Sequence, residues 1–134
     1  MPVVRRGDEV AVRVDIRESG LARTIPAGQG IQLGLFTLYP EQHLLHRAGQ
    51  PVRIGSRALS LLIALVENRG ELVSKEALIE RVWPETFVEE ANLRVHIAAL
   101  RKVLGDTSDP PQYIANVSGR GYRLVAALRA ATRR

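Results

Sequence analysis

The side chains best suited to chemistry in this 134-residue chain lie between positions 88 and 125. Residues 88–105 have helical spacing, because at 3.6 residues per turn Leu93, Ile97, Leu100 and Leu104 fall on one face. The opposite face then carries small and basic side chains, namely Ala91, Arg94, Val95, Ala98 and Lys102, with Asn92, Ala99 and Arg101 at its margins. Because this face is rich in small residues and poor in acid, it can approach another surface closely. Together with the basic, turn-rich run at 113–125, it is typical of a surface that binds nucleic acid.

Charge is distributed unevenly along the chain, whose formal net charge is +5. Residues 94–134 hold eight lysines and arginines against two acids, whereas residues 1–93 hold 11 basic and 12 acidic residues. This asymmetry is expected where one edge of a domain meets a polyanion. An ordinary solvated surface is the alternative interpretation of the charge alone.

Length and composition predict one domain with a core of its own. The longest strongly apolar run, residues 59–66, is far shorter than the roughly 20 residues that span a bilayer. The N-terminus lacks the apolar segment of a signal peptide. The chain contains no cysteine, which excludes disulfides and thiolate metal sites. We therefore expect a cytoplasmic protein without a membrane segment.

The first part of the chain is predicted to contain only short strands. Residues 1–30 are interpreted as an N-terminal extension of unknown role, in which 9–17 alternate like a strand before a glycine-rich break. Strands are then expected at 33–39, 43–47 and 51–54, and the short turns between them predict an antiparallel meander.

Three helices and a hairpin are expected next. Ser56 is the candidate cap of the first helix, which stops at 68–70, and Ser74 caps the second, at 75–83. Pro84 ends that helix and opens a short loop before the third helix, at about 89–104. With the hairpin at 113–125, the order predicts an α+β winged helix-turn-helix domain at 31–128, followed by a basic tail at 129–134. In such domains the third helix enters the major groove, and the hairpin lies along the backbone or minor groove.

Several motifs in the expected order resemble the OmpR/PhoB family of transcription-regulator output domains. They are LVSKEAL at 72–78, the Val82-Trp83-Pro84 junction, the helix at 88–105 and VSGRGYR at 117–123. The resemblance implies sequence-specific binding to double-stranded DNA and regulation of transcription. It also implies side-by-side binding on direct repeats, so we expect a monomer that forms a head-to-tail dimer only on DNA. Only about 30 residues precede the expected fold, too few for the receiver domain that family members commonly carry.

The resemblance assigns roles to single positions of the third helix. The candidates for reading base edges are Asn92, Val95 and Ala99, and the candidates for neutralising phosphates are Arg94, Arg101 and Lys102. An asparagine can read adenine through two hydrogen bonds, and an apolar side chain can meet a thymine methyl. The family often has arginines at the positions of Ala98 and Ala99, which argues against guanine readout from the middle of this helix.

The resemblance also assigns roles to the hairpin, here called the wing, and to the loop before the third helix. Arg120 is the first candidate for a narrow minor groove, with Asn116, Ser118 and Arg123 as further DNA-binding candidates. The loop of Pro84, Glu85, Thr86 and Phe87 matches the family's transactivation loop, which implies contact with RNA polymerase. A plain connector is the alternative for this loop.

Catalysis and metal binding are not expected, and no cofactor is predicted. His43 and His46 would point to opposite faces of a strand, and His96 has no cysteine or nearby acid. The segment at 119–121 lacks the spacing of a phosphate-binding loop. Trp83 and Tyr122 are interpreted as core residues. The alternative function is a winged helix that binds an acidic protein partner.

Overall fold

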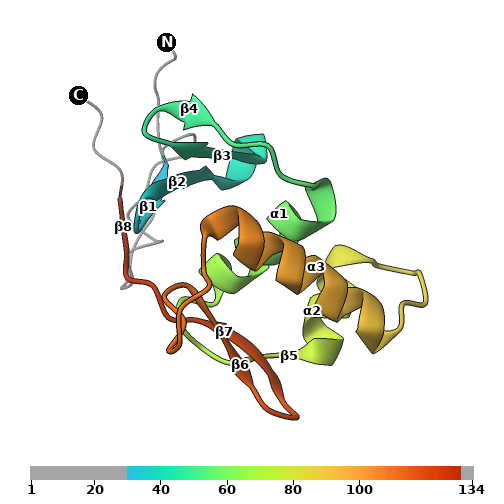
Figure 1. The fold of residues 1–134 in the computed structure, drawn as a ribbon. Coiled ribbons are helices and arrows are strands. Elements are labelled where there is room, and N and C mark those ends of the chain that lie inside the picture. The colour runs from blue at the N-terminus through green and yellow to red at the C-terminus, as the bar shows by residue number, and fades with distance from the viewer. Residues whose placement is uncertain (1–29, 131–134) are drawn as a thin grey trace, which may run out of the picture.

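The computed structural model describes residues 30–130, which form two antiparallel sheets and three α-helices (Figure 1). The strand-like run expected at 9–17 lies outside these residues. Strands come first, three helices follow, and a hairpin completes the domain. The predicted α+β winged helix-turn-helix architecture is therefore confirmed.

The first sheet has five strands, of which one comes from the end of the described chain. Its members are β1 (Ile31–Leu33), β2 (Phe36–Tyr39), β3 (Leu44–Arg47), β4 (Gln50–Pro51) and β8 (Leu128–Ala130), in the order β4-β3-β2-β1-β8. β8 pairs antiparallel with β1, with Leu128 opposite Leu33. Paired structure thus continues two residues past position 128, into the segment that the sequence assigned to the basic tail.

The prediction of one strand at 33–39 was wrong, because the chain turns between β1 and β2. Gly34 has a φ of +57°, and the phenol of Tyr113 fills the space that a side chain there would need. The backbone N–H of Leu35 donates a hydrogen bond to the Tyr113 hydroxyl at 3.2 Å. A glycine in the left-handed region and a contact with a distant residue thus accompany the turn that divides the predicted strand.

The other two strands of the meander are shorter than predicted. A 3-10 helix, η2 (Pro40–Gln42), follows β2, and His43 then adopts a left-handed φ of +57°. β3 therefore begins at Leu44, and His43 lies outside it. β4 contains only Gln50–Pro51 and ends well before residue 54.

The three helices are α1 (Ser56–Glu67), α2 (Lys75–Val82) and α3 (Glu90–Leu104). Ser56 was wrongly predicted as a cap, since Gly55 precedes the helix and no side chain caps it. Ser74 is the cap of α2, and its hydroxyl accepts a hydrogen bond from the Ala77 N–H at 3.0 Å. Gly105, with a left-handed φ of +71°, ends α3 as predicted.

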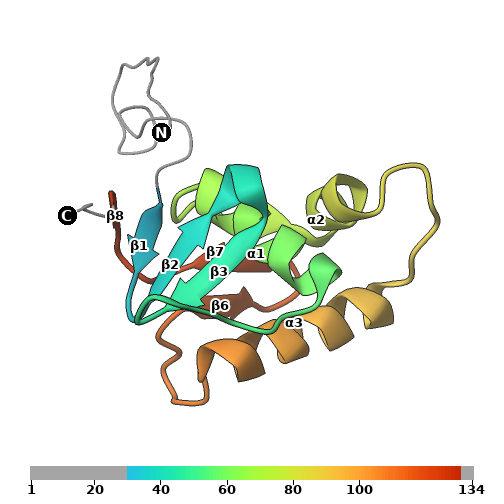
Figure 2. The ribbon, with the colours of Figure 1, turned by 90° about the horizontal axis from the view of Figure 1, so that it is seen from above.

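The core is built around α1, from which eight residues are buried. The predicted inner face of α3 is confirmed, because Leu93, Ile97, Leu100 and Leu104 are all buried. α1 contacts both α2 and α3, and Figure 2 shows α3 along one edge of the molecule with α1 behind it. Burying each such leucine contributes about 1.5–3 kcal/mol. The outer face of α3 is therefore exposed to solvent.

The hairpin that forms the wing is part of a three-stranded sheet. β6 (Ile114–Val117) and β7 (Gly121–Leu124) form the hairpin, and β5 (Val73–Ser74), which the sequence did not predict, pairs with β7. Gly119 has a φ of +73° at the turn. Gly121 has another role, because a Cβ there would lie 2.0 Å from the carbonyl oxygen of Val73.

Candidate nucleic-acid interface

The outer face of α3 is exposed along its length. Its exposed members include all the base-reading candidates and two of the three cations: Asn92, Arg94, Val95, Ala98, Ala99 and Lys102. Val95 is a large apolar side chain that is 63% exposed. No acid lies within this face, since Glu90 is the only acidic residue of α3 and sits in its first turn. The surface combines positive charge with small and apolar groups, as major-groove readout requires.

The start of α3 is held against α2 by an ion pair. Lys75, in the first turn of α2, contacts the carboxylate of Glu90. A hydrogen bond from Lys75, and then its charge, hold the pKa of Glu90 below the usual range of a glutamate. The pair links the N-terminal ends of α2 and α3 and adds to the packing of the buried face of α3.

Asn92 does not cap α3, because Glu89 occupies that position. The backbone carbonyl of Asn92 is instead 2.9 Å from Nδ1 of His96, whose ring packs edge-on against Trp83 at 5.2 Å between centroids. The Asn92 side chain is exposed and takes part in no hydrogen bond within residues 30–130. Its amide can therefore reach a ligand without breaking an internal contact.

The wing lies beside α3 and shares a depression with it. Asn116 and Tyr122 form the wing side of this depression, Arg94 and Ala98 belong to the helix side, and its volume is about 380 Å³. Asn116 pairs with Tyr122 across the hairpin. Tyr122 is buried, which confirms its prediction as a core residue.

The remaining wing candidates do not all lie beside α3. Ser118 and Arg120 are exposed in the turn between β6 and β7. Arg123 is exposed between the buried Tyr122 and Leu124, so it faces the side of the sheet opposite Asn116. It lines a separate depression with Arg69. The structure therefore brings Asn116 to α3 and places Arg123 elsewhere.

Arg101 differs from the other cations of α3 in having an acidic partner. Its Nε lies 3.8 Å from Oδ2 of Asp106, and its side chain is only 29% exposed. Asp106 was not singled out from the sequence, although an acid directly after a helix-ending glycine is a local signal. It is the one buried charged residue among positions 30–130.

The loop between α2 and α3 presents an aromatic side chain to solvent. Pro84, Glu85, Thr86 and Phe87 are all exposed, and Phe87 is 87% exposed. Trp83 directly before them is half-buried against the core, as predicted. Arg57 from α1 secures this corner by donating to the Val82 carbonyl at 3.0 Å. The loop thus starts from a fixed corner and carries its exposed side chains outward.

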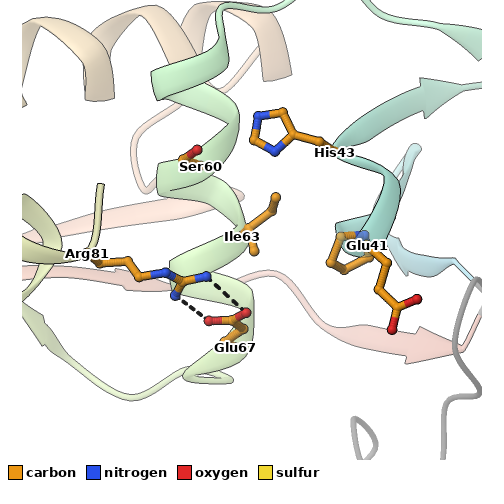
Figure 3. A pocket seen from close by; sticks show the side chains of 7 residues that line it. Glu41, His43, Ser60, Ile63, Glu67 and Arg81 are labelled. Atoms are coloured by element: carbon orange, nitrogen blue, oxygen red, sulfur yellow. Dashed lines mark hydrogen bonds and ion pairs between the residues drawn. The ribbon is translucent and has the colours of Figure 1, made fainter. Parts of the chain in front are cut away.

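A third depression, of about 270 Å³, lies between η2, α1 and α2 (Figure 3). It contains His43, Ser60 and Glu67, a set that invites comparison with a hydrolytic site. The carboxylate of Glu67 is bound by Arg81, and His43 contacts Ser56 at 3.4 Å instead of Ser60. The Glu67 hydrogen bond raises the pKa of Arg81 above its usual value. A nucleophile, a base and an orienting acid are not joined here.

No group of three histidine, cysteine or acidic side chains suitable for a metal ion occurs within residues 30–130. A helix able to span a bilayer is also not found in this part of the chain.

Comparison with known proteins identifies the same region. The family described as "Transcriptional regulatory protein, C terminal" matches residues 49–124. The transcriptional activator CadC of Escherichia coli is 32% identical over 96 residues, which are 71% of this chain and 19% of CadC. The phosphate regulon regulator PhoB of Rhizobium meliloti is 35% identical over 95 residues, 70% of this chain and 41% of PhoB. The chain thus spans less than half of the length of these curated relatives.

Solved structures show the same fold. The DNA-binding domain of E. coli CadC has a TM-score of 0.66 and 30% identity, and the match covers 77% of this chain and 97% of that domain. The DNA-binding domain of Klebsiella pneumoniae RstA, solved in complex with the RstA box, has a TM-score of 0.62 and 25% identity, with coverages of 71% and 95%.

Proposed function

This chain belongs to the OmpR/PhoB-type family of transcriptional regulatory protein C-terminal domains, and on that premise we propose that it binds double-stranded DNA sequence-specifically and regulates transcription. The family is a class of DNA-binding regulators and not of enzymes. The observation that carries the proposal is the outer face of α3, which is exposed, basic and free of acid beside the wing. The activity belongs in the cytoplasm, where the proposed DNA target lies.

In this proposal α3 lies in the major groove. Asn92 and Val95 read base edges, since one offers an amide and the other an apolar surface, and Ala99 allows close approach. Arg94 and Lys102 neutralise phosphates, because both are exposed and neither forms an ion pair within the described residues. Phosphate contacts position the helix, whereas base contacts select the sequence.

The wing contacts the minor groove and the backbone in this proposal. Arg120, which is exposed at the turn, enters a narrow minor groove. Ser118 and Asn116 contribute polar contacts from the turn and from the side that faces α3. Arg123, on the opposite face of the sheet, contacts only phosphate, outside the groove read by α3.

The loop before α3 is proposed to contact RNA polymerase. Phe87 is the natural anchor, because a phenylalanine that is 87% exposed lowers its free energy by burial in a partner. Phe87→Ala should reduce activated transcription in a reconstituted system while the affinity for DNA stays unchanged. If the unmodified protein and the Phe87→Ala variant activate transcription equally, the loop is a plain connector.

Two copies are proposed to bind direct repeats head to tail. No strongly apolar dimer surface is evident on residues 30–130, so pairing should require DNA. Sedimentation should show a monomer at micromolar concentration and two copies on a duplex with two repeats. A stable dimer without DNA would contradict this arrangement.

The experiment that tests the function begins by selecting bound sequences from a random duplex pool. Asn92→Ala should then weaken binding to the selected site by about 1–3 kcal/mol and hardly affect a scrambled duplex. Lys102→Ala should weaken binding to both duplexes alike. It should also flatten the salt dependence, the slope of log affinity against log salt concentration, by about one unit. Arg47→Ala, which removes an exposed cation from β3 in the first sheet, is the matched control. If a random duplex fails to compete with an acidic protein for the basic edge, the protein-interaction alternative is favoured.

A further inference from the structure

Asp106 joins the end of α3 to the start of the wing. Its carboxylate accepts hydrogen bonds from the backbone N–H of Gln112, at 2.7 Å, and of Ile114, at 2.9 Å. Its own N–H donates to the carbonyl of Arg101 at 2.8 Å. The residue is 2% exposed, and its side chain is fully buried. A buried carboxylate that accepts two backbone hydrogen bonds fixes the position of both segments.

The same carboxylate faces Arg101. Oδ2 of Asp106 lies 3.8 Å from Nε of Arg101, so a full negative charge stands behind this cation. The positive charge that Arg101 offers to a phosphate is correspondingly reduced, because opposite charges at this distance attract strongly away from bulk water. Lys102, the next residue, is exposed and has no such partner within the described residues. Two adjacent cations of α3 therefore have different electrostatic surroundings.

We propose that Asp106 is a specificity-determining residue, which positions the wing relative to α3 and withholds the charge of Arg101 from the phosphates. The inference rests on the proposed DNA-binding function. Every phosphate contact raises the affinity for all sequences alike, whereas discrimination comes from base edges. By opposing Arg101, Asp106 lowers the affinity for all duplexes alike, and the contrast between the preferred site and other sequences depends on its second role. By anchoring β6, it lets α3 and Arg120 engage one site together.

The first test compares neutral substitutions of the two adjacent cations, which leave Asp106 in place. Arg101→Gln should leave the salt dependence of binding nearly unchanged. Lys102→Gln should flatten it by about 0.9 unit, the value expected for one lost phosphate contact. Arg101→Gln flattening the dependence as much as Lys102→Gln would overturn the inference. Lys102 is exposed, Arg101 is partly exposed, and Asp106 keeps its two backbone hydrogen bonds when Arg101 is replaced, so neither substitution is expected to prevent folding.

The second test releases Arg101 from its partner. Asp106→Asn keeps the size of the side chain and removes its charge. It should strengthen binding to a scrambled duplex and steepen the salt dependence by about 0.9 unit, because Arg101 becomes free to meet a phosphate. The specificity ratio should fall by about an order of magnitude, because the wing loses its charged anchor and with it a contact made only at the preferred site. Adding Arg101→Gln to the Asp106→Asn variant should return the salt dependence of binding to that of the unmodified chain. A merely structural role would weaken binding to both duplexes with no change in salt dependence and no reversal, which would overturn the proposal.

Failure of this inference can be told apart from failure of the proposed function. If the unmodified chain shows no preference among duplexes, the proposed function fails and the inference falls with it. If the unmodified chain has a preferred site but the two cation variants behave alike, only the inference fails. Thermal unfolding of each variant, followed through Trp83, monitors the fold.

Discussion

Replacement of Gly121 by alanine should damage the wing more than replacement of Gly119, although the two glycines stand two residues apart. An alanine Cβ at position 121 would lie 2.0 Å from the carbonyl oxygen of Val73 and 2.9 Å from the Cα of Ser74. Both atoms belong to the backbone of β5 and cannot rotate away. At position 119 no atom lies within 4 Å, and the only obstacle is the left-handed φ of +73°.

The expected loss in the free energy of unfolding follows from the displacement of β5. A carbon and an oxygen need more than 3 Å between them, so β5 must shift by over an ångström, enough to break its pairing with β7. The lost backbone hydrogen bonds cost about 1–2 kcal/mol. Because Ser74 caps α2, its displacement adds about 1 kcal/mol. We expect a total near 3 kcal/mol for Gly121→Ala, against about 1 kcal/mol for Gly119→Ala.

The assay is denaturant unfolding followed by tryptophan fluorescence, since the chain has one tryptophan, Trp83. For a domain of this size, 1 kcal/mol lowers the melting temperature by roughly 4–8 °C, so calorimetry should also separate the two variants. Gly121→Ala should in addition weaken the contribution of the wing to DNA binding. If Gly121→Ala proves as stable as Gly119→Ala, the close approach of β5 is not what requires a glycine there.

Three further outcomes follow from single contacts. Glu90→Gln should lower stability near neutral pH. Because the pKa of Glu90 is lowered in the folded state, its stabilisation is present above the ordinary glutamate pKa and is lost as the pH falls through the lowered value, so the difference between the two proteins in urea titrations should shrink as the pH is lowered from about 7. Leu100→Ala should cost about 2–5 kcal/mol in the free energy of unfolding, since the side chain is fully buried, and a cost under 1 kcal/mol would contradict its place in the core. Tyr113→Phe removes the hydroxyl that binds the Leu35 N–H and should cost about 1 kcal/mol by the same measurement, whereas an unchanged midpoint would show that water replaces the contact.

Elements with a strong local signal were predicted closely from the sequence. The third helix was expected at about 89–104 and spans Glu90–Leu104, because four apolar residues recur at helical spacing and Gly105 ends the run. The cap at Ser74 was also predicted, because a serine hydroxyl before a helical run can accept a hydrogen bond from a free N–H of the first turn, although the same reasoning was wrong for Ser56. These signals lie within about one helical turn of the feature that they determine.

Elements that depend on distant partners were missed or misplaced. β5 and β8 have two and three residues, too few for an alternating pattern, and they exist because β7 and β1 offer open edges. The turn at Gly34 depends on Tyr113, whose hydroxyl binds a residue 78 positions earlier in the chain. The spacing of residues along the sequence does not predict contacts between positions this far apart.

The candidate interface shows the same division between local and distant information. Exposure of the outer face of α3 follows from helical periodicity, because the burial of Leu93 and Leu100 on one side leaves the other side free. Electrostatic surroundings do not follow from periodicity. Arg94, Arg101 and Lys102 are equivalent as residue types, yet a buried carboxylate lies close to one of them. How many cations a helix offers to phosphates therefore depends on what the rest of the chain places behind it, and counting basic residues overestimates that number wherever a buried acid lies within reach.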